Sequence, residues 1–329
     1  MTVRWGLLST APINRSILAA ARESDRADVV AVASRDAGRA EAYAQEHGID
    51  RAHGSYNALL QDPDVDAVYI SLPNGLHVNW AMRALEAGKH VLCEKPLSRR
   101  AEEVEAAFDQ AETMGLILSE GFMWRHHPQT SKLAEVIAAG AIGALRLVRV
   151  AFSFPLALER GAGDARFDPE LDGGAMMDVG CYCVSAIRFV AGEPETVAGK
   201  QVIGPTGVDI VFAGTLSHAG DVVSHFDCSF AVPRRSELEV LGEEGSLFLA
   251  NPFVITSPGI ELRRDGDVEH VAVEHKDSYL LELDNVSGAI LGESPLLLGR
   301  EDAVGQARTI AALYRAAEQA APVLMGAVP

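Results

Sequence analysis

The sequence predicts two domains, an α/β domain with a parallel sheet followed by an α+β domain rich in antiparallel strands. The chain has 329 residues, which is too long for one ordinary hydrophobic core. Apolar strand-like runs alternate with helical segments in the first third, which is typical of βαβ units. After about residue 200, strand-like runs follow one another without helices, and such runs form antiparallel sheets.

The first domain is expected to contain five strands and the helices between them. The predicted strands span 3–8, 28–33, 67–72, 91–93 and 116–120, and the predicted helices span 16–21, 40–47, 77–87 and 101–114. Gly48 and Gly88 follow two of these helices and are expected to end them. Right-handed crossovers then give a parallel sheet.

The second domain begins where this alternation stops. Helices are expected at 131–139, 180–190 and 301–320, and strands at 145–154, 208–217, 222–230, 237–241, 246–250, 260–264 and 270–273. The predicted domains are therefore 1–122 and 123–329. The amphipathic helix at about 301–320 is expected to be able to pack back on the first domain.

Composition narrows the class of protein. The formal net charge of −18 disfavours binding to nucleic acid or to anionic membranes. The N-terminus lacks the pattern of a signal peptide, and we find no uninterrupted apolar run of about 18 residues. The four scattered cysteines, which are Cys93, Cys181, Cys183 and Cys228, favour reduced thiols and a cytoplasmic location.

The first strand leads into a candidate phosphate-binding turn, Gly6-Leu7-Leu8-Ser9-Thr10-Ala11-Pro12-Ile13. The segment lacks the usual G-x-G-x-x-G/A pattern of dinucleotide sites. Small residues such as Ala11 still let backbone amides approach a pyrophosphate, and Ser9 or Thr10 can add hydroxyl donors. An ordinary strand–turn–helix fits the segment equally well.

The end of the second strand favours NADP over NAD. An acidic residue commonly holds the ribose hydroxyls of NAD at this place, whereas here Ser34 and Arg35 follow the strand. A guanidinium binds a 2′-phosphate by charge-assisted hydrogen bonds. Arg39 joins the predicted cofactor set. Two alternatives stay open: Asp36 pairs with Arg35 or holds a ribose, and Arg35 is a solvated surface charge.

Three ordered segments carry a family resemblance. The first runs from Ser71 to Leu97 and contains Cys93-Glu94-Lys95-Pro96, the second is Glu120-Gly121-Phe122-Met123-Trp124-Arg125-His126-His127-Pro128, and the third is Gly173-Gly174-Ala175-Met176-Met177-Asp178-Val179-Gly180-Cys181-Tyr182. Together they resemble the glucose–fructose oxidoreductase, inositol dehydrogenase and MocA (Gfo/Idh/MocA) family. The segment from Arg300 to Tyr314 resembles the last helix of that family.

The resemblance implies a Rossmann domain, an α+β domain with a large open, mainly antiparallel sheet, and a homodimer or homotetramer formed through that sheet. It also implies roles for single residues. Lys95 would contact the nicotinamide ribose and the substrate hydroxyl, while Asp178 and Tyr182 would belong to the catalytic motif. The remaining predicted cofactor contacts are Ser9, Thr10, Ala11, Ile13, Ser34, Arg35, Arg39, Leu72, Pro73, Asn74, His77, Glu94 and Pro96. Ser9 departs from the glycine common in relatives.

Tyrosine and lysine suit the oxidation of a carbinol. The ordinary pKa of tyrosine is near 10, and a nearby ammonium group lowers it. We therefore expect Tyr182 to act as the general acid/base and Lys95 as its electrostatic partner. Asp178 lies four residues before Tyr182 and, on a helix, faces the same way. Periodicity alone favours a core tyrosine for Tyr182, a helix cap or pair for Asp178 and a surface loop residue for Lys95, and the resemblance reverses this preference.

Arg125, His126 and Arg166 are further candidates for substrate binding, although surface placement fits each of them as well. The adjacent His126 and His127 point apart in regular structure and lack a carboxylate partner, so no metal site is expected. The sequence thus predicts an NADP- or NAD-dependent oxidoreductase of a sugar or polyol. A trans-dihydrodiol or other cyclic-diol dehydrogenase and a non-catalytic dinucleotide-binding sensor are the alternatives.

Overall fold

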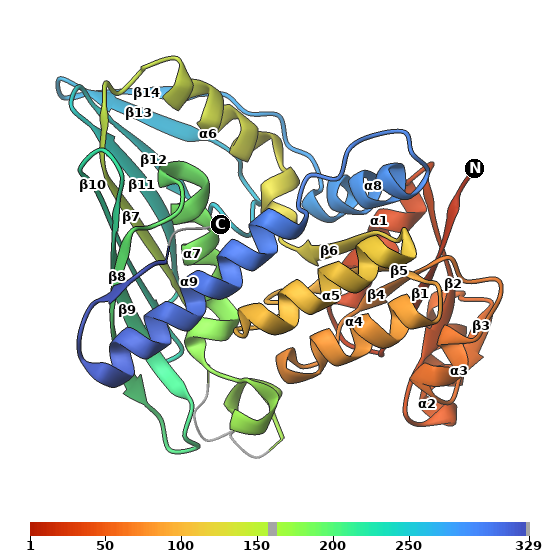
Figure 1. Cartoon of the computed structure of the whole chain (residues 1–329). Coiled ribbons are helices and arrows are strands. Elements are labelled where there is room, and N and C mark those ends of the chain that lie inside the picture. The colour runs from red at the N-terminus through yellow and green to blue at the C-terminus, as the bar shows by residue number, and fades with distance from the viewer. Residues whose placement is uncertain (157–162, 327–329) are drawn as a thin grey trace. The chain divides into compact units, whose positions relative to one another are not determined.

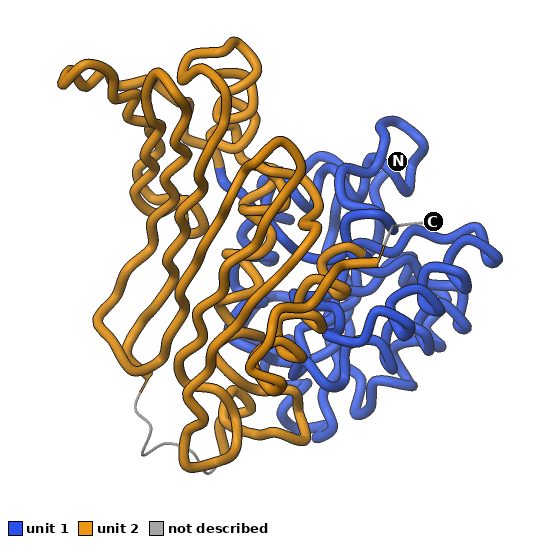
Figure 2. Tube along the Cα trace, turned by 60° about the vertical axis from the view of Figure 1, so that its left-hand side comes forward, with its two compact units in different colours: residues 1–123, 277–304 blue, residues 124–276, 305–329 orange. Residues whose placement is uncertain are grey.

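The computed structural model describes residues 1–156 and 163–326 (Figure 1). The chain divides into two compact units (Figure 2). Unit 1 contains Met1–Met123 and Asp277–Val304, and unit 2 contains Trp124–Lys276 and Gly305–Pro329. That residues 1–122 and 123–329 form two separate domains stays a prediction. The division adds residues 277–304 to the N-terminal unit.

Unit 1 contains the expected parallel sheet. Its strands pair in the order β3-β2-β1-β4-β5-β6 and are β1 (Val3–Leu8), β2 (Ala27–Ala33), β3 (Arg51–His53), β4 (Ala67–Ile70), β5 (His90–Glu94) and β6 (Leu118–Gly121). Each pair of neighbouring strands in this sheet runs parallel. The order reverses between β1 and β4, which is where open α/β sheets bind ligands beyond the carboxyl ends of their strands.

The helices of unit 1 begin and end at residues suited to those places. They are α1 (Asn14–Glu23), α2 (Ala37–His47), α3 (Tyr56–Leu60), the 3₁₀ turn η1 (Asn74–Leu76), α4 (His77–Glu86), α5 (Ala101–Met114) and α8 (Ser278–Ile290). The Asp36 carboxylate caps α2, and Gly48 ends it in the left-handed conformation with φ of 71°. Asp277 caps α8 by accepting from the amides of Tyr279 and Leu280.

Helix α8 completes the core of unit 1 although it comes late in the chain. Leu283 and Val286 of α8 are fully buried in the same cluster as Trp5 of β1 and Tyr69 of β4. The Trp5 indole Nε1 donates to Ser287 Oγ at 3.1 Å. Each fully buried apolar side chain contributes about 1.5–3 kcal/mol, so this helix stabilises the sheet substantially.

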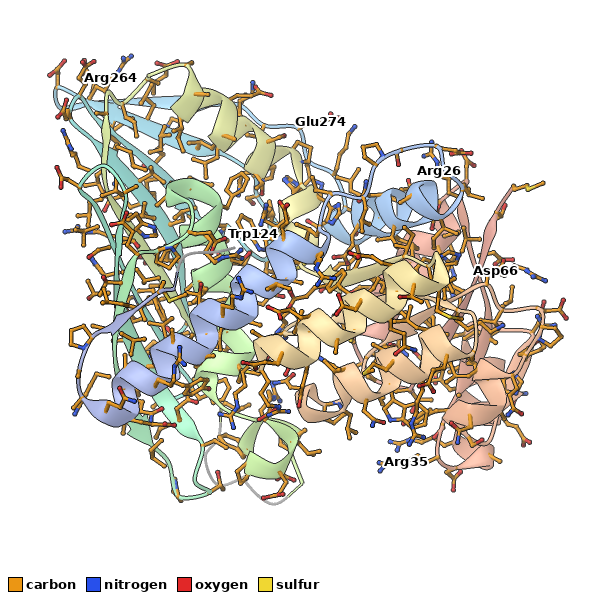
Figure 3. All side chains as sticks on the ribbon, viewed as in Figure 1. Arg26, Arg35, Asp66, Trp124, Arg264 and Glu274 are labelled. Atoms are coloured by element: carbon orange, nitrogen blue, oxygen red, sulfur yellow. The ribbon has the colours of Figure 1, made fainter. Side chains whose placement is uncertain are left out.

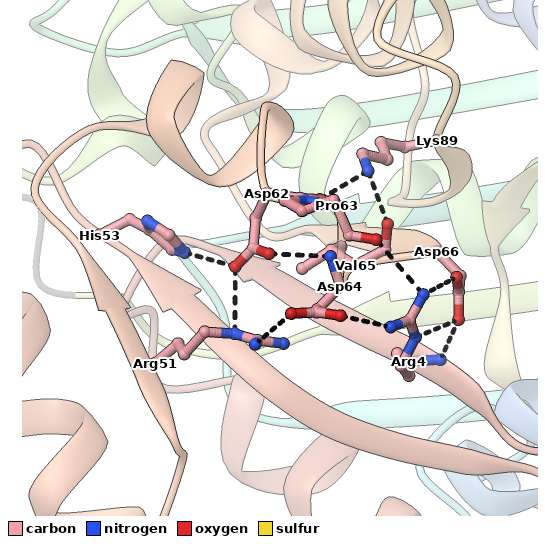
Figure 4. A network of polar contacts seen from close by, with 9 residues as sticks. All are labelled: Arg4, Arg51, His53, Asp62, Pro63, Asp64, Val65, Asp66 and Lys89. Atoms are coloured by element: carbon pink, nitrogen blue, oxygen red, sulfur yellow. Dashed lines mark hydrogen bonds and ion pairs between the residues drawn. The ribbon is translucent and has the colours of Figure 1, made fainter.

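A polar network closes the amino ends of β1 and β4 (Figure 4). The Arg4 guanidinium binds Asp66 through two nitrogens, with Nε–Oδ2 and Nη2–Oδ1 distances of 3.0 and 2.7 Å. Lys89 Nζ donates to the carbonyl oxygens of Asp62 and Val65 at 2.8 and 2.6 Å. These contacts lie at the edge of the sheet opposite to the carboxyl ends, so they serve stability rather than ligand binding.

Unit 2 is built on a nine-stranded sheet of order β14-β13-β12-β11-β7-β10-β9-β8-β15. Its strands are β7 (Leu145–Ser153), β8 (Thr196–Ile203), β9 (Asp209–His218), β10 (Val222–Ser229), β11 (Arg235–Gly242), β12 (Ser246–Ala250), β13 (Ile260–Arg264), β14 (Asp267–Val271) and β15 (Val323–Leu324). The predicted large, mainly antiparallel sheet is confirmed. The parallel pairing of β7 with β10 was not expected.

Helices cover one face of this sheet. They include α6 (Pro128–Ala138), the π turn η6 (Met176–Gly180), α7 (Cys181–Ala191) and α9 (Arg300–Gln319). Helix α9 belongs to unit 2 from Gly305 on. Tyr314 of α9 packs edge-on against Phe212 of β9 with ring centroids 5.6 Å apart. On strands β7, β10 and β11 the opposite face exposes Arg149, His225 and Glu237, and is therefore the polar face.

One segment, Pro169–Ala191, is long and apolar enough to cross a membrane by length and composition alone. It comprises the 3₁₀ turn η5 (Pro169–Leu171), the π turn η6 and the helix α7. The apolar window is 78% buried inside the protein, as in the core helix of a globular fold. This segment therefore gives no clear indication of a membrane span.

Candidate active site

A pocket of about 380 Å³ lies at the carboxyl ends of β1, β2 and β4 in unit 1. This size lies at the lower end of the range of small-molecule sites. The pocket is lined by Ser9, Thr10, Ala11, Pro12, Ser34, Arg35, Asp36, Arg39, Tyr56, Ser71, Leu72 and Pro73. Eight of the predicted cofactor residues therefore lie together with Asp36, which the sequence left open as a ribose contact or a partner of Arg35. Pro12, Tyr56 and Ser71 also line the pocket but were not among the predicted cofactor contacts.

The turn after β1 is held by a closed ring of hydrogen bonds. Ser71 Oγ donates to Asn14 Oδ1 at 2.6 Å, and Asn14 Nδ2 donates to the Ser9 carbonyl oxygen at 2.7 Å. Ser9 Oγ lies 2.7 Å from Ser71 Oγ and accepts from the Ala11 amide at 3.0 Å. Ser9 has φ of 152°, a conformation that favours glycine. The buried Asn14 was missed by the sequence reasoning.

Helix α1 begins directly beyond this turn, with Ile13 at its N-cap position. Within the described part of the chain, no side chain caps the N-terminus of α1. An uncapped helix N-terminus presents backbone N–H groups and a partial positive charge to an anion. The turn and helix thus fit the pyrophosphate of a dinucleotide, although the glycine pattern is absent.

Two arginines border the pocket at the end of β2. Arg35 and Arg39 are both exposed, and Arg35 is labelled in Figure 3. Asp36 Oδ1 accepts from the Arg39 amide at 2.7 Å, so this carboxylate is used to cap α2. The buried Ser34 lies between these groups, and its Oγ accepts from the Asp36 amide at 3.3 Å. A local positive border on a protein of net charge −18 fits a phosphate group.

The end of β5 carries Glu94 and Lys95, both half-buried, followed by the buried Pro96. The Tyr69 hydroxyl donates to Glu94 Oε1, and the Lys95 amide donates to Glu94 Oε2 at 3.3 Å. Asn74 lies in η1, directly after β4. Since β4 and β5 are neighbours in the sheet, the predicted nicotinamide residues meet at the same edge of unit 1.

His77 joins the two loops at this edge. Its Nδ1 lies 2.8 Å from the Pro96 carbonyl oxygen and its Nε2 lies 2.7 Å from the Leu72 carbonyl oxygen. The ring is 1% exposed, and burial, with a smaller effect of the Lys95 charge, lowers the pKa of His77. Both ring nitrogens are thus engaged within the protein. We infer that His77 acts by positioning these loops.

In unit 2 the residues of the predicted catalytic motif occupy two successive helical turns. Asp178 lies in the π turn η6, and its amide donates to the Gly174 carbonyl oxygen at 3.0 Å. Tyr182 lies in the first turn of α7, is 8% exposed, and packs its ring against Phe152 and Phe253. Single π turns are frequent at functional sites. The sequence predicted the helix but not the π turn.

Asp209 anchors the start of this motif and was not found from the sequence. Its Oδ2 accepts from the Met176 amide at 2.7 Å, and its Oδ1 accepts from the Tyr314 hydroxyl at 2.8 Å. Gly174 has φ of 123°, and a Cβ there would lie 2.3 Å from Asp209 Oδ1. The carboxylate therefore occupies the space that only a glycine leaves open.

The candidate substrate residues of unit 2 differ in their surroundings. Arg166 binds Asp164 through two nitrogens, and this hydrogen bonding, with smaller effects that include the charge of Asp178, raises its pKa. Arg125 lies over the ring of Phe189 at 4.6 Å. Burial and the Arg125 charge lower the pKa of His126 to about 4, so its imidazole is neutral at physiological pH.

Metal-ligating groups do not gather within the described ranges, where no cluster of three or more His, Cys, Asp or Glu side chains has metal-binding geometry. All four cysteines are buried free thiols. Burial, followed by the charges of neighbouring groups, raises the pKa values of Cys93, Cys183 and Cys228 well above the ordinary range. These thiols are therefore held protonated and unreactive.

Family models match both parts of the chain. Residues 4–122 match the model described as the oxidoreductase family with an NAD-binding Rossmann fold, and residues 130–248 match the GFO/IDH/MocA C-terminal domain. The chain belongs to the GFO/IDH/MocA family. The resemblance drawn from the sequence is thus confirmed, and this member of the family is an NAD(P)-dependent oxidoreductase.

Curated relatives of this GFO/IDH/MocA chain include several dehydrogenases. D-xylose 1-dehydrogenase (NADP(+)) 2 of Haloferax volcanii is 41% identical over 326 residues, which cover 97% of this chain and 98% of the relative. Trans-1,2-dihydrobenzene-1,2-diol dehydrogenase of Homo sapiens is 36% identical over 261 residues, which cover 77% and 75%. By their names, one relative is a dehydrogenase of D-xylose and the other a dehydrogenase of a dihydrobenzenediol.

A solved structure of the same family extends the comparison. The 3-ketoreductase KijD10 of Actinomadura kijaniata, in complex with NADP and TDP-benzene, aligns with a TM-score of 0.90 and 30% identity over 96% of this chain and 98% of that one. Other structures of KijD10 carry substitutions of a lysine or of a tyrosine. An NADP-bound relative is thus similar along almost the whole chain.

Proposed function

We propose that this protein is an NADP-dependent dehydrogenase or reductase that acts on one hydroxyl or carbonyl carbon of a sugar or sugar-derived substrate. The observation that carries the proposal is the pocket at the carboxyl ends of β1, β2 and β4, bordered by Arg35 and Arg39 and followed along the sheet by Lys95. A xylose dehydrogenase that uses NADP is 41% identical over nearly the whole chain, which supports both the cofactor and the substrate class.

The chemistry requires the substrate hydroxyl to lose a proton while its carbon becomes a carbonyl. A bound nicotinamide would supply the hydride acceptor for oxidation and the hydride donor for reduction. Tyr182 Oη takes the hydroxyl proton in oxidation and gives it back in reduction. The Lys95 ammonium stabilises the phenolate and the developing negative charge on the substrate oxygen. Asp178 orients the substrate hydroxyl or Lys95.

Residues of the first unit would hold the cofactor. The turn at Ser9, Thr10 and Ala11 and the start of α1 at Ile13 would receive the pyrophosphate, and Arg35 and Arg39 with Ser34 the 2′-phosphate. Leu72, Pro73, Asn74, Glu94 and Pro96 would surround the nicotinamide ribose. Arg125, His126 and Arg166 stay candidates for substrate contact, and the neutral His126 is suited to hydrogen-bond a sugar hydroxyl.

A substrate screen tests the reaction class. Purified protein is incubated with NADP or NAD and a panel of aldoses, inositols and trans-dihydrodiols, and with NADPH and ketosugars, and the nicotinamide absorbance is followed. We expect turnover with NADP and an aldose. Turnover confined to trans-dihydrodiols would establish the alternative suggested by the dihydrodiol dehydrogenases. Tight NADP binding without turnover of any substrate would establish the non-catalytic sensor.

Two variants test the catalytic assignment. Lys95→Ala and Tyr182→Phe are each expected to lower kcat by at least about a hundredfold, the usual lower size of acid/base effects, while NADPH still binds. Lys132→Ala is the matched control, because Lys132 lies on α6 in an exposed ion pair with Glu135. Near-normal kcat in both Lys95→Ala and Tyr182→Phe would overturn the mechanism.

We also propose a homodimer or homotetramer formed through the polar face of the unit 2 sheet. That face presents charges of both signs, such as Arg149 beside Glu239 and Arg235 beside Asp227. A surface of paired opposite charges is self-complementary across a two-fold axis. Sedimentation at low and high salt tests the assembly, and a monomer in both conditions would overturn it.

The four free thiols support a cytoplasmic location.

A further inference from the structure

The π turn that carries Asp178 is closed by a hydrogen bond between its two ends. The Cys181 amide donates to the carbonyl oxygen of Met176, five residues earlier. Turns of this kind are rare in helices and mostly occur singly. Asp178 lies inside the turn, and Tyr182 follows directly after Cys181. The shape of the turn therefore sets the direction of the Asp178 side chain relative to Tyr182.

A carboxylate from a distant strand holds the first residue of the turn. The Met176 amide donates to Asp209 Oδ2 at 2.7 Å, and the Tyr314 hydroxyl of α9 donates to Asp209 Oδ1 at 2.8 Å. Asp209 is buried at the start of β9, and Gly174 packs against it. Hydrogen bonds to a carboxylate are strong, and the low dielectric of the interior strengthens them further. The amide end of the π turn is thus fixed from outside the helix.

A buried glutamine of α9 holds the other end of the turn. Helix α9 lies beside α7 in unit 2 (Figure 1), and Gln306 Nε2 donates to the Cys181 carbonyl oxygen at 2.7 Å. Gln306 Oε1 accepts from Arg188 Nη1 at 3.2 Å, and this guanidinium also binds Glu193. A side-chain amide has separate donor and acceptor ends, so these contacts fix the way Gln306 points. The carbonyl end of the π turn is therefore held as well.

The two contacts bracket the same π hydrogen bond. Met176 gives its carbonyl oxygen to that bond and its amide to Asp209, while Cys181 gives its amide to the bond and its carbonyl oxygen to Gln306. Both outer partners bind α9, since Gln306 belongs to it and Asp209 accepts from its Tyr314. An α-helical turn in place of the π turn would rotate one end of the helix against the other and break one of the outer bonds.

We propose that Asp209 and Gln306 are positioning residues, which hold the π turn at its two ends and so fix the direction of Asp178 relative to Tyr182. Each acts through the backbone of the motif and not on the substrate. The effect on turnover rests on the proposed function, because Asp178 and Tyr182 act on the substrate there. The shape of the turn does not depend on it. A displacement of about 1 Å at such a site can cost about a hundredfold in turnover.

Substitutions at Asp209 test the first contact. Asp209→Asn keeps an oxygen for the Met176 amide and turns its own amide toward the Tyr314 hydroxyl, which can accept. Asp209→Leu has a similar size but offers no acceptor. We expect Asp209→Asn to keep kcat within about threefold of the wild type and Asp209→Leu to lower it about tenfold or more. Tyr314→Phe removes only one of the two bonds and is the milder variant if Asp209→Leu fails to fold.

A substitution at Gln306 tests the second contact. Gln306→Glu keeps the size of the side chain and the acceptor for Arg188, but its carboxylate cannot donate to the Cys181 carbonyl oxygen. We expect kcat to fall about tenfold or more, because the end of the turn is released. In this variant and in Asp209→Leu the KM for NADP should change little, since the predicted cofactor residues lie in unit 1.

Ser224→Ala is the matched control for a merely structural effect. It removes a buried hydrogen bond to His218, which lies at the opposite end of β9 from Asp209. We expect Ser224→Ala to lose stability on the same sheet but to keep the wild-type kcat at a temperature where every variant is folded. Equal losses of kcat in Ser224→Ala and Asp209→Leu would overturn a positioning role for Asp209.

Hydrogen–deuterium exchange tests the held turn without any substrate. A backbone amide exchanges when its hydrogen bond opens, so its exchange rate reports the local stability of the turn. The Cys181 amide, which closes the turn, should exchange about tenfold faster or more in Asp209→Leu and Gln306→Glu than in the wild type. In Asp209→Asn it should exchange as in the wild type. The amide of Phe189, late in α7, should not change in these variants.

The outcomes separate this inference from the proposed function. Unchanged exchange at Cys181 in Asp209→Leu and Gln306→Glu would overturn the held turn whatever the enzyme does, and a change in only one variant would overturn the role of the other residue. Faster exchange with a normal kcat, or a kcat of Asp209→Asn as low as that of Asp209→Leu, would overturn the effect on turnover. If no substrate is found, the proposed function fails, and the exchange rates still decide whether the turn is held.

Discussion

Ser9 Oγ and Ser71 Oγ lie 2.7 Å apart and join the turn after β1 to the residue that follows β4. Ser71 donates its proton to Asn14, so the hydroxyl proton between the two serines belongs to Ser9. Side-chain hydrogen bonds therefore fix a turn that glycines shape in many dinucleotide sites. The result is a phosphate-binding turn that glycine spacing alone does not reveal.

Substitutions at Ser9 should show how this turn is held. Ser9→Ala is expected to lower the free energy of unfolding by about 1–3 kcal/mol, because buried partners lose a hydrogen bond while the φ of 152° stays unfavourable for alanine. Ser9→Gly should cost less, since glycine accepts that φ. Urea unfolding measures both. Finding Ser9→Gly less stable than Ser9→Ala would contradict the strain at this position.

Arg35 should decide the preference for NADP. Arg35→Ala is expected to raise the Kd of NADPH about tenfold or more, because a charge-assisted contact is lost, and to change the Kd of NADH little. Fluorescence titration with both cofactors provides the measurement. Arg26→Ala, an exposed arginine of the same unit paired with Glu293, serves as control. Equal losses for the two cofactors would remove Arg35 from the phosphate site.

The Arg4–Asp66 pair should contribute to stability only above acidic pH. Hydrogen bonding to Arg4, opposed by burial, lowers the pKa of Asp66. A lowered pKa gives stability that is present above the unfolded value of about 3.9 and is lost as pH falls through the folded pKa. Asp66→Asn should therefore have a lower Tm than the wild type near about pH 7, and the difference should shrink as the pH falls below about 4.

That comparison needs a control with an exposed carboxylate. Asp28→Asn removes a charge from β2, where the side chain is exposed, and should leave the Tm unchanged at both pH values. A Tm gap between Asp66→Asn and the wild type that persists in acid would mean that packing, rather than the ionised carboxylate, stabilises this edge of the sheet.

Gly174 should tolerate no side chain. Gly174→Ala is expected to lower the free energy of unfolding by more than about 3 kcal/mol, since the added Cβ meets Asp209 and the positive φ is strained. Gly259→Ala is the control, because nothing lies near its Cβ position. Differential scanning calorimetry compares the two, and similar Tm values would show that the motif around Asp178 shifts without cost.

The sequence predicted most strands of both sheets because their apolar residues form the short runs and alternating patterns that are typical of strands. The runs at Val3–Leu8, Ser246–Ala250 and Ile260–Arg264 form strands with the expected bounds. Helix α5 has the expected bounds. Gly115 ends it in the left-handed conformation. The elements β3 and α3 were missed because they span only three and five residues, too few to show a period. Strand β8 was missed because Gly199, Lys200 and Gln201 interrupt its apolar residues.

Helix α8 was missed for a different reason. Its sequence, SYLLELDNVSGAI, buries Glu282 and Ser287 along with Leu283, so the polar residues interrupt the apolar pattern. Only tertiary packing shows that these polar groups face a core. In the same way, the ring of Ser9, Asn14 and Ser71 and the link from Asp209 to Met176 join residues distant in sequence, and a single sequence holds no signal for them. The meeting of Lys95 with Tyr182 stays a prediction.

The late position of α8 also bears on how the protein is made. The N-terminal strands emerge from the ribosome first, yet Leu283 and Val286, which bury Trp5, are translated only after strands β7 to β14 of the large sheet have been synthesised. Domains completed in this way cannot finish folding during early elongation. The nascent chain must carry an uncovered apolar sheet face for most of its synthesis, and a chain released after residue 276 would expose the same face to chaperones and proteases.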